Sequence, residues 1–181
     1  MNVCLVSVLG ESPGVVTEAL EWIRKWFKGK ILNIVFYTTD KSVIESVKLL
    51  KKALRRKDVR KRIGNVKTRF IKLPMIDIKE EKDAKELWKS LKKALRKPKG
   101  EYIFNVSGGR RLMCILLFAC WQKIVKRGYV INVISYLPRE EMEAIREVVV
   151  EKARNNLRLS KEDVYSYFFS KGKYKVFKIK I

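Results

Sequence analysis

Short apolar runs alternate with amphipathic segments along most of the chain. The apolar runs are nearly continuous, as expected of strands buried on both faces, and cover residues 3–9, 31–37, 66–73, 102–106 and 129–136. The segments that follow them have the three- and four-residue spacing of helices and cover residues 15–27, 41–56, 80–95, 112–126 and 140–154. This alternation predicts an α/β fold with a mainly parallel sheet and helices on both faces.

The last part of the chain has a different pattern. Residues 164–169 and 174–181 are aromatic and β-branched, and the turn Ser170-Lys171-Gly172-Lys173 separates them. This pattern predicts a C-terminal β-hairpin, which would lengthen the sheet or cover one of its edges. We expect one domain over residues 1–155 and a hairpin extension of the same domain over residues 156–181.

Two glycine-containing turns follow predicted strands. They are Gly10-Glu11-Ser12-Pro13-Gly14, after the first strand, and Ser107-Gly108-Gly109-Arg110-Arg111, after the fourth. In a sheet of order 3-2-1-4-5, these two strands flank the point where the strand order reverses, which is where such sheets bind ligands. The two turns would then converge on one crevice.

The second turn has the chemistry of an anion site. A strand that ends in Ser-Gly-Gly and leads into a helix presents free N–H groups at the positive end of the helix. Arg110 and Arg111 open that helix, where a cation opposes the helix dipole unless an anion lies between the two. The alternative is a strand-to-helix turn with solvated arginines. In the first turn, Ser12 before Pro13 predicts an N-cap with proline at the first helical position.

The charge of the chain indicates an anionic partner. It has 42 basic and 19 acidic residues, a net charge of +23. Adaptation to high temperature enriches a protein in both basic and acidic residues, so it does not account for an excess of basic ones. The excess favours a nucleic acid or a nucleotide as the partner. The densest basic block covers residues 48–62. Its apolar residues have helical spacing, so the basic residues could also be the solvent-exposed face of an ordinary helix.

The absence of histidine limits the chemistry. It removes the commonest general base, histidine-containing zinc sites and every Ser/His or Cys/His nucleophile pair. The three cysteines, Cys4, Cys114 and Cys120, lie in apolar runs without Cys-x-x-Cys spacing, so we expect reduced core residues. We expect neither a metal nor a cofactor.

Other sequence signals are also missing. Gly10 and Gly14 have no central glycine between them, so the nicotinamide-binding pattern is absent, as is the Gly-x-x-x-x-Gly-Lys phosphate loop. No apolar run approaches the roughly 20 residues of a membrane span, and the first residues lack the basic region of a signal peptide. We expect a cytoplasmic protein with no membrane partner.

Residues 9–18 (Leu-Gly-Glu-Ser-Pro-Gly-Val-Val-Thr-Glu) and 105–113 (Asn-Val-Ser-Gly-Gly-Arg-Arg-Leu-Met) resemble, as a pair, the motifs of the CRISPR-associated Rossmann fold (CARF) family. The alternating pattern extends the resemblance over about residues 1–155. The resemblance implies a Rossmann-like fold that binds cyclic oligoadenylates, the messengers of type III CRISPR complexes, across the two-fold axis of a homodimer.

The resemblance is nearest to the stand-alone CARF ring nucleases. Many CARF proteins carry a ribonuclease domain with an Arg-x4-His motif, which a chain without histidine cannot contain. The residues after the fifth predicted helix are too few for the winged helix of other members. The resemblance thus implies cleavage of cyclic tetra-adenylate, or of the ring of six adenylates, to linear products with a 2′,3′-cyclic phosphate. The ribose 2′-OH supplies the nucleophile, so the protein holds the in-line geometry and stabilises charge.

The resemblance also implies roles for individual residues. Ser12 would position the scissile phosphate, and a C-terminal lysine would stabilise its charge, with Lys171 favoured over Lys173; both lysines could instead be exposed turn residues. Arg110 and Arg111, with the Gly108 and Gly109 amides, would hold the phosphates of the ring. The remaining predicted ring contacts are Gly10, Glu11, Pro13, Thr39, Asp40, Ser107 and Tyr136.

Two qualifications accompany these roles. For Tyr136 a purely structural role is the stronger interpretation. Glu11 would repel phosphates, so it should point away from them or meet an arginine. Two other functions remain open from the sequence. One is a CARF sensor that binds the ring without cutting it, and the other is a nucleic-acid-binding protein that uses residues 48–62.

Overall fold

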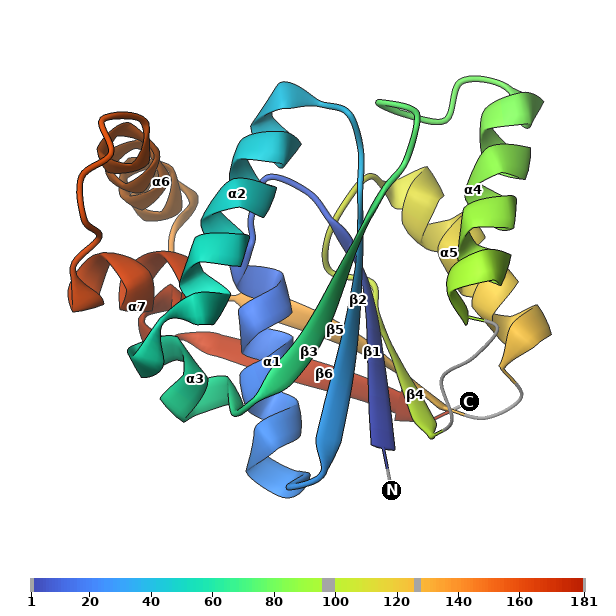
Figure 1. The fold of residues 1–181 in the computed structure, drawn as a ribbon, viewed down its shortest axis with the longest axis horizontal. Coiled ribbons are helices and arrows are strands. Elements are labelled where there is room, and N and C mark those ends of the chain that lie inside the picture. Colours follow the sequence, from blue (N-terminus) through green and yellow to red (C-terminus); the bar gives the residue numbers. More distant parts are fainter. Residues whose placement is uncertain (1, 96–99, 126–127, 181) are drawn as a thin grey trace.

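A six-stranded sheet forms the centre of the computed structural model, which describes residues 2–95, 100–125 and 128–180 (Figure 1). The strands are β1 (Asn2–Leu9), β2 (Lys30–Tyr37), β3 (Val66–Lys72), β4 (Glu101–Asn105), β5 (Gly128–Ser135) and β6 (Tyr174–Lys180). Their order is β3-β2-β1-β4-β5-β6, with β1 to β5 parallel and β6 antiparallel to β5. The predicted α/β class and the order 3-2-1-4-5 are therefore confirmed.

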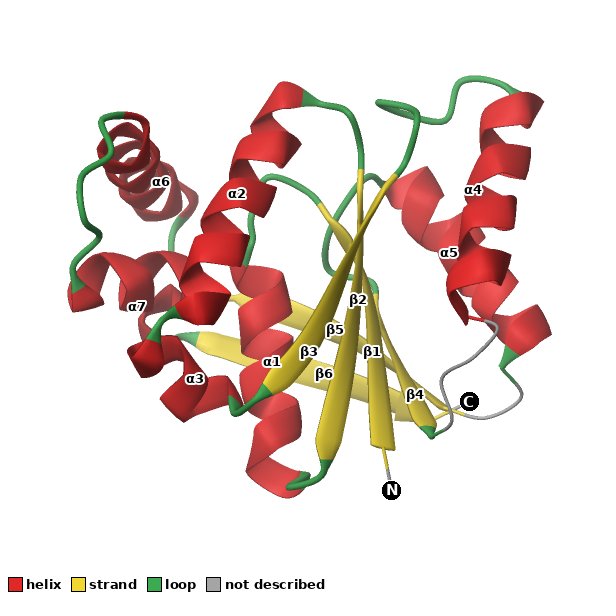
Figure 2. Ribbon diagram, in the orientation of Figure 1, coloured by secondary structure: helices red, strands yellow, loops and turns green. Residues whose placement is uncertain are grey.

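Helices cover both faces of the sheet (Figure 2). They are α1 (Gly14–Trp26), α2 (Lys41–Arg55), α3 (Lys57–Ile63), α4 (Glu81–Leu95), α5 (Arg111–Ile124), α6 (Arg139–Arg154) and α7 (Lys161–Phe169). One core contains side chains of α1, α2, α3, α6 and α7, and the other contains side chains of α4 and α5. No helix in the described residues is long and apolar enough to cross a membrane.

The C-terminal segment differs from the prediction in its first arm. Strand β6 pairs with β5 as an antiparallel strand, so the predicted lengthening of the sheet is confirmed. Residues 164–169 are helical instead of extended, and they form the end of α7. A capping box begins this helix: the Ser160 hydroxyl accepts from the Asp163 amide at 3.0 Å, and Asp163 accepts from the Ser160 amide at 2.7 Å. The domain boundary near residue 155 stays a prediction, and Ile181 lies outside the described residues.

The prediction of reduced core cysteines is confirmed for Cys4 and Cys114. Cys4 and Cys114 are free and buried, and burial raises the pKa of each to about 12 and about 11, respectively. Thiols with raised pKa values are poor nucleophiles at neutral pH. The side chain of Cys120 lies outside the description.

One carboxylate is buried among the helices on the α1 side of the sheet. Glu18 of α1 is 1% exposed, and its Oε1 has no hydrogen-bond partner in the described part of the chain. Burial raises the pKa of Glu18 to about 7, while a hydrogen bond with the Ser170 side chain acts in the opposite direction. A carboxyl group in this environment keeps its proton to a higher pH than an exposed one does.

Candidate functional site

The two glycine turns meet at the carboxyl ends of β1 and β4. A Cβ atom at Gly10 would lie 3.0 Å from the Gly109 backbone nitrogen, and one at Gly108 would lie 2.3 Å from the Val8 carbonyl oxygen. Gly109 has a φ of +78°, which favours glycine. The backbone approaches that bring the turns together therefore require glycine at these positions, and the predicted convergence on the switch point is confirmed.

Asn105 and Ser107 brace the second turn from inside. Asn105 Nδ2 donates to the Val15 carbonyl at 2.9 Å, and its Oδ1 accepts from the Ser107 amide at 3.0 Å and from the Ser107 hydroxyl. The Ser107 hydroxyl in turn accepts from the Val133 amide of β5. The Ser107 side chain thus joins the turn to β5, and a ring contact of Ser107 stays a prediction.

The amides of Gly108 and Gly109 donate to no residue that the structure describes. They precede Arg110, the N-cap residue of α5, whose backbone is extended. Free amides at a helix N-terminus attract an anion, as the sequence predicts.

The two arginines differ in their surroundings. Arg110 Nη1 lies 2.9 Å from Asp77 Oδ2, and its Nη2 lies 3.7 Å from Asp40 Oδ2. Arg111 is exposed and forms no hydrogen bond or ion pair with any described residue. Arg111 is therefore the free guanidinium at the turn, whereas Arg110 already has two carboxylate neighbours.

Asp40 acts as a helix cap in the structure. Its carboxylate accepts from the Ser42 amide at 2.9 Å and from the Ser42 hydroxyl at 2.6 Å at the start of α2. These bonds, more than the charge of Arg110, hold the pKa of Asp40 below its usual range. Thr39 donates its amide to the Met75 carbonyl at 3.1 Å, which joins the ends of β2 and β3. Ring contacts of Thr39 and Asp40 stay predictions.

The first turn presents a serine hydroxyl and a paired carboxylate. Ser12 is exposed, and its hydroxyl bonds to no described residue, so the predicted side-chain N-cap is wrong. Pro13 takes the N-cap position, one residue later than predicted, and α1 begins at Gly14. Glu11 Oε2 lies 2.5 Å from Arg146 Nη1 of α6. The expectation that Glu11 meets an arginine is confirmed.

The C-terminal lysines Lys171 and Lys173 lie at the end of the sheet that carries the glycine turns, where β5 ends and β6 begins. The Lys173 carbonyl accepts from the Tyr136 amide at 2.8 Å, which ties the start of β6 to the end of β5. Lys171 has a positive φ of 51°, and its Nζ lies 2.8 Å from Glu141 Oε1 of α6. Lys173 is exposed and forms no ion pair with a described residue. Tyr136 is 53% exposed, with Lys175 Nζ 5.9 Å from its ring centre.

The sequence did not indicate several residues that shape the site. The Ser42 hydroxyl lies 2.9 Å from Glu11 Oε1, and Ser46 donates to the Glu11 carbonyl at 2.7 Å, so α2 and Arg146 together hold the first turn. Asp77 follows the third predicted strand, and a carboxylate at a strand end was a usable signal for it. The described residues include no group of three or more acidic or cysteine side chains placed to hold a metal ion.

A mainly parallel sheet with glycine turns at its switch point defines a Rossmann-like α/β protein. The chain belongs to the CRISPR-associated protein NE0113 family, whose sequence profile matches residues 12–176. Its fold is similar to that of Enterococcus italicus Csm6 bound to cyclic hexa-2′-fluoro-hexa-dAMP, with a TM-score of 0.52 and 13% identity. The match covers 100% of this chain and 42% of the Csm6 chain. No curated protein sequence matches this chain.

Proposed function

We propose that the chain binds cyclic tetra-adenylate as a homodimer and cleaves it without a metal ion, which would switch off type III CRISPR signalling. The observation that carries this proposal is the meeting of the two glycine turns at the carboxyl ends of β1 and β4, because one turn carries the exposed Ser12 and the other carries free amides and the exposed Arg111. The family membership and the cyclic ligand of the similar Csm6 support a ring of adenylates as the ligand.

The proposed reaction needs few protein groups. The ribose 2′-oxygen forms a bond to the adjacent phosphorus, the bond from phosphorus to the 5′-oxygen breaks, and the proton of the 2′-OH is lost as the 5′-oxygen gains one. No water is consumed, and the products end in a 2′,3′-cyclic phosphate and a 5′-OH. Ser12 and the turn amides would hold the phosphate in line, and a lysine would stabilise the charge on the phosphorane.

The first test is incubation of the purified protein with labelled cyclic tetra-adenylate in excess EDTA, followed by chromatography. We expect linear products that end in a 2′,3′-cyclic phosphate. An intact ring that co-elutes with the protein would show a sensor and contradict the nuclease. If neither cleavage nor binding occurred, a parallel incubation with cyclic hexa-adenylate would decide whether the ring size or the whole proposal is wrong.

The homodimer has a candidate surface beside the site. Five large apolar side chains of α5, β5 and β6 are between 39% and 65% exposed: Leu112, Ile115, Ile134, Phe177 and Ile179. Ile131 and Val133 belong to the core on the α1 side of the sheet, so Ile134 points to the α5 side. This apolar surface begins one residue after Arg111, so a second copy seated on it would bring two sites together.

We therefore expect Ile115→Glu to convert the dimer into a monomer, because a carboxylate would be buried without a partner at the interface. Ring binding should be lost with it, since the ring spans both copies. Light scattering after size exclusion and titration with the ring measure the two effects. Val148→Glu on α6 is the matched control, because Val148 is also exposed, at 46%, but lies on the other side of the sheet. A dimer that persists in Ile115→Glu would contradict this surface.

A further inference from the structure

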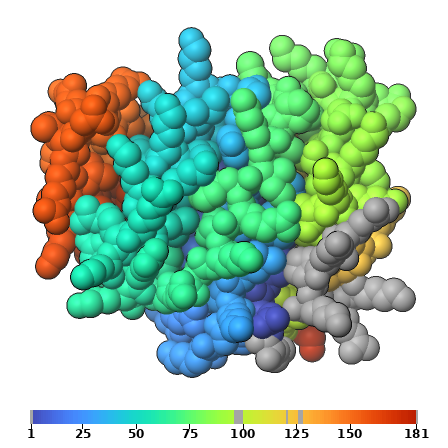
Figure 3. All heavy atoms as spheres, viewed as in Figure 1, coloured from blue at the N-terminus to red at the C-terminus, as the bar shows by residue number. Residues whose placement is uncertain are grey.

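A hollow of about 470 Å³ lies between α2 and α6, and no residue of the glycine turns lines it. Figure 3 shows the orange surface of α6 next to the cyan surface of α2 on this side of the molecule. The hollow belongs to the basic block that the sequence singled out, and the proposed ring site does not use it.

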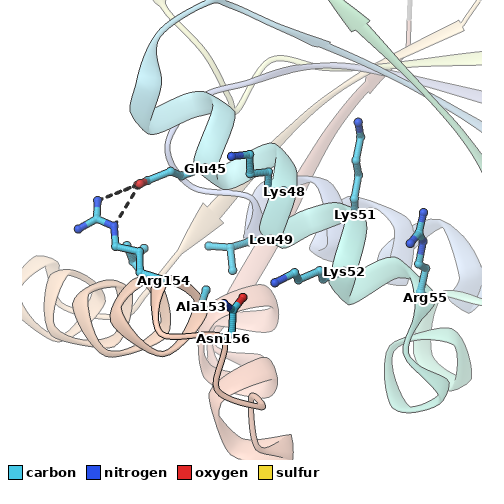
Figure 4. Close-up of a pocket in the computed structure, with 10 residues that line it drawn as sticks. Glu45, Lys48, Leu49, Lys51, Lys52, Arg55, Ala153, Arg154 and Asn156 are labelled. Atoms are coloured by element: carbon cyan, nitrogen blue, oxygen red, sulfur yellow. Dashed lines mark hydrogen bonds and ion pairs between the residues drawn. The ribbon is translucent and has the colours of Figure 1, made fainter.

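The walls of the hollow are cationic. Lys48, Lys51, Lys52 and Arg55 of α2 line it, and Arg154 of α6 lies opposite. Figure 4 shows Lys48 and Lys52 turned toward α6, whereas Lys51 and Arg55 point away from it. The one carboxylate in its lining, Glu45, accepts from Arg154 at 2.9 and 3.1 Å. No described carboxylate pairs with the lysines of the lining, so their positive charge is uncompensated within the described residues.

The floor of the hollow is apolar. Leu49, which is 4% exposed, lies at its base with Val150 and Ala153. Apolar carbon between cationic walls fits a ligand that alternates anionic groups with flat or weakly polar ones. A nucleotide chain has this chemistry, because its phosphates alternate with ribose and base.

A second hollow of about 550 Å³ lies at the α2–α3 junction, and some of its lining residues neighbour those of the first along the chain. Arg55 lines the first and Arg56 the second, where Asp58 Oδ2 lies 2.7 Å from Arg56 Nη2. The second hollow also contains the cations Lys57, Arg158 and Lys161. Arg56 Nη1 donates to the Leu159 carbonyl at 2.7 Å, which holds the segment before α7 against the start of α3. We call the two hollows together the basic groove.

We propose that the basic groove binds the phosphodiester backbone of a single-stranded nucleic acid. The cations line a concave groove with an apolar floor, which suits a strand whose bases are accessible. A duplex presents its phosphates on a convex rod and hides its bases in the stack, so it matches the groove less well. This inference does not depend on the proposed ring site.

The test is fluorescence anisotropy with labelled single-stranded RNA and DNA of roughly 20 nucleotides, longer than the usual site sizes of about 4–16 nucleotides. We expect salt-dependent binding, with a slope of log K against log salt of about −0.7 for each phosphate contact. Lys48→Glu with Lys52→Glu should weaken binding about tenfold or more and reduce the slope by about 1.4, because two contacts are lost. The RNA and DNA arms identify which strand is preferred.

The matched control is Lys92→Glu with Lys93→Glu on α4. This pair changes the net charge by the same amount, is exposed, and lies on the opposite face of the sheet. We expect it to keep the wild-type affinity. Equal weakening by both pairs, no weakening by the groove pair, stronger binding of a duplex, or full competition by ATP would each overturn the proposal. Lys48→Gln with Lys52→Gln replaces the groove pair if the reversed charges prevent folding, and retained ring binding by these variants separates the groove from the proposed function.

Discussion

Replacing Glu18 by glutamine is expected to stabilise the folded protein by about 3 kcal/mol above pH 8 and to have little effect at pH 4. Glu18 is 1% exposed, and burial raises its pKa from 4.5 to about 7. Each pKa unit corresponds to about 1.4 kcal/mol, so a rise of this size is a large term for one side chain. Glutamine has the shape of the protonated carboxyl group and carries no charge to desolvate.

The sign of the effect follows from the order of the two pKa values. Below the unfolded value of 4.5, Glu18 is protonated in both states and costs nothing. As the pH rises toward about 7, the unfolded chain ionises while the folded protein keeps its proton, so the free energy of unfolding falls. Above about 7 the folded protein ionises too, and the loss becomes constant. The amide removes this dependence.

Urea unfolding at a series of pH values between 4 and 9 measures the effect. Wild type should lose stability between about pH 4.5 and 7, and Glu18→Gln should lose less over that range. Glu147→Gln on α6 is the control, because Glu147 is exposed and forms no ion pair with a described residue. The same stability difference between wild type and Glu18→Gln at pH 5 and pH 8 would refute the assignment.

The strand order was predictable because it depends on long apolar runs and on the handedness of parallel crossovers. The helical nature of residues 164–169 was not, because a short apolar run buried on all sides looks the same in a strand and in a helix. Val164, Tyr167, Phe168 and Phe169 are each at most 3% exposed, so no polar face shows the helical period. The local signal was a capping box, formed by Ser160 and by Asp163 three residues later. It starts a helix before the aromatic run.

The site was predictable to the extent that it lies in contiguous turns. Glycines at strand ends locate the switch point, and the order of strands brings them together. The partners of those turns were not predictable, because they come from distant helices. Arg146 lies 135 residues from Glu11 and pairs with it only because α6 returns beside the first turn. Likewise, the sequence does not distinguish Arg110 from Arg111, and only the carboxylates of Asp77 and Asp40 separate the two.

If the proposed nuclease is correct, Ser12→Ala should slow single-turnover cleavage of the ring by about a hundredfold and leave ring affinity nearly unchanged. Removing one group that holds or stabilises a transition state typically costs about 10²–10³ in rate. Arg111→Ala should instead weaken binding, because its free guanidinium contacts phosphate in the ground state as well as in the transition state. Measuring the cleavage rate and the dissociation constant separately distinguishes the two roles. Full turnover in both variants would show that the site lies elsewhere.

The lysine variants decide which ammonium stabilises the phosphorane. The resemblance favours Lys171, but Glu141 already lies 2.8 Å from its Nζ, whereas Lys173 forms no ion pair with a described residue. We therefore expect Lys173→Ala to slow cleavage about a hundredfold and Lys171→Ala to have a smaller effect. Glu141→Gln is the sharper test, because it frees Lys171 without removing it. Faster cleavage in Glu141→Gln, together with a large loss of rate in Lys171→Ala, would assign this role to Lys171 instead. An unchanged rate in Glu141→Gln would support Lys173 as the residue that stabilises the phosphorane.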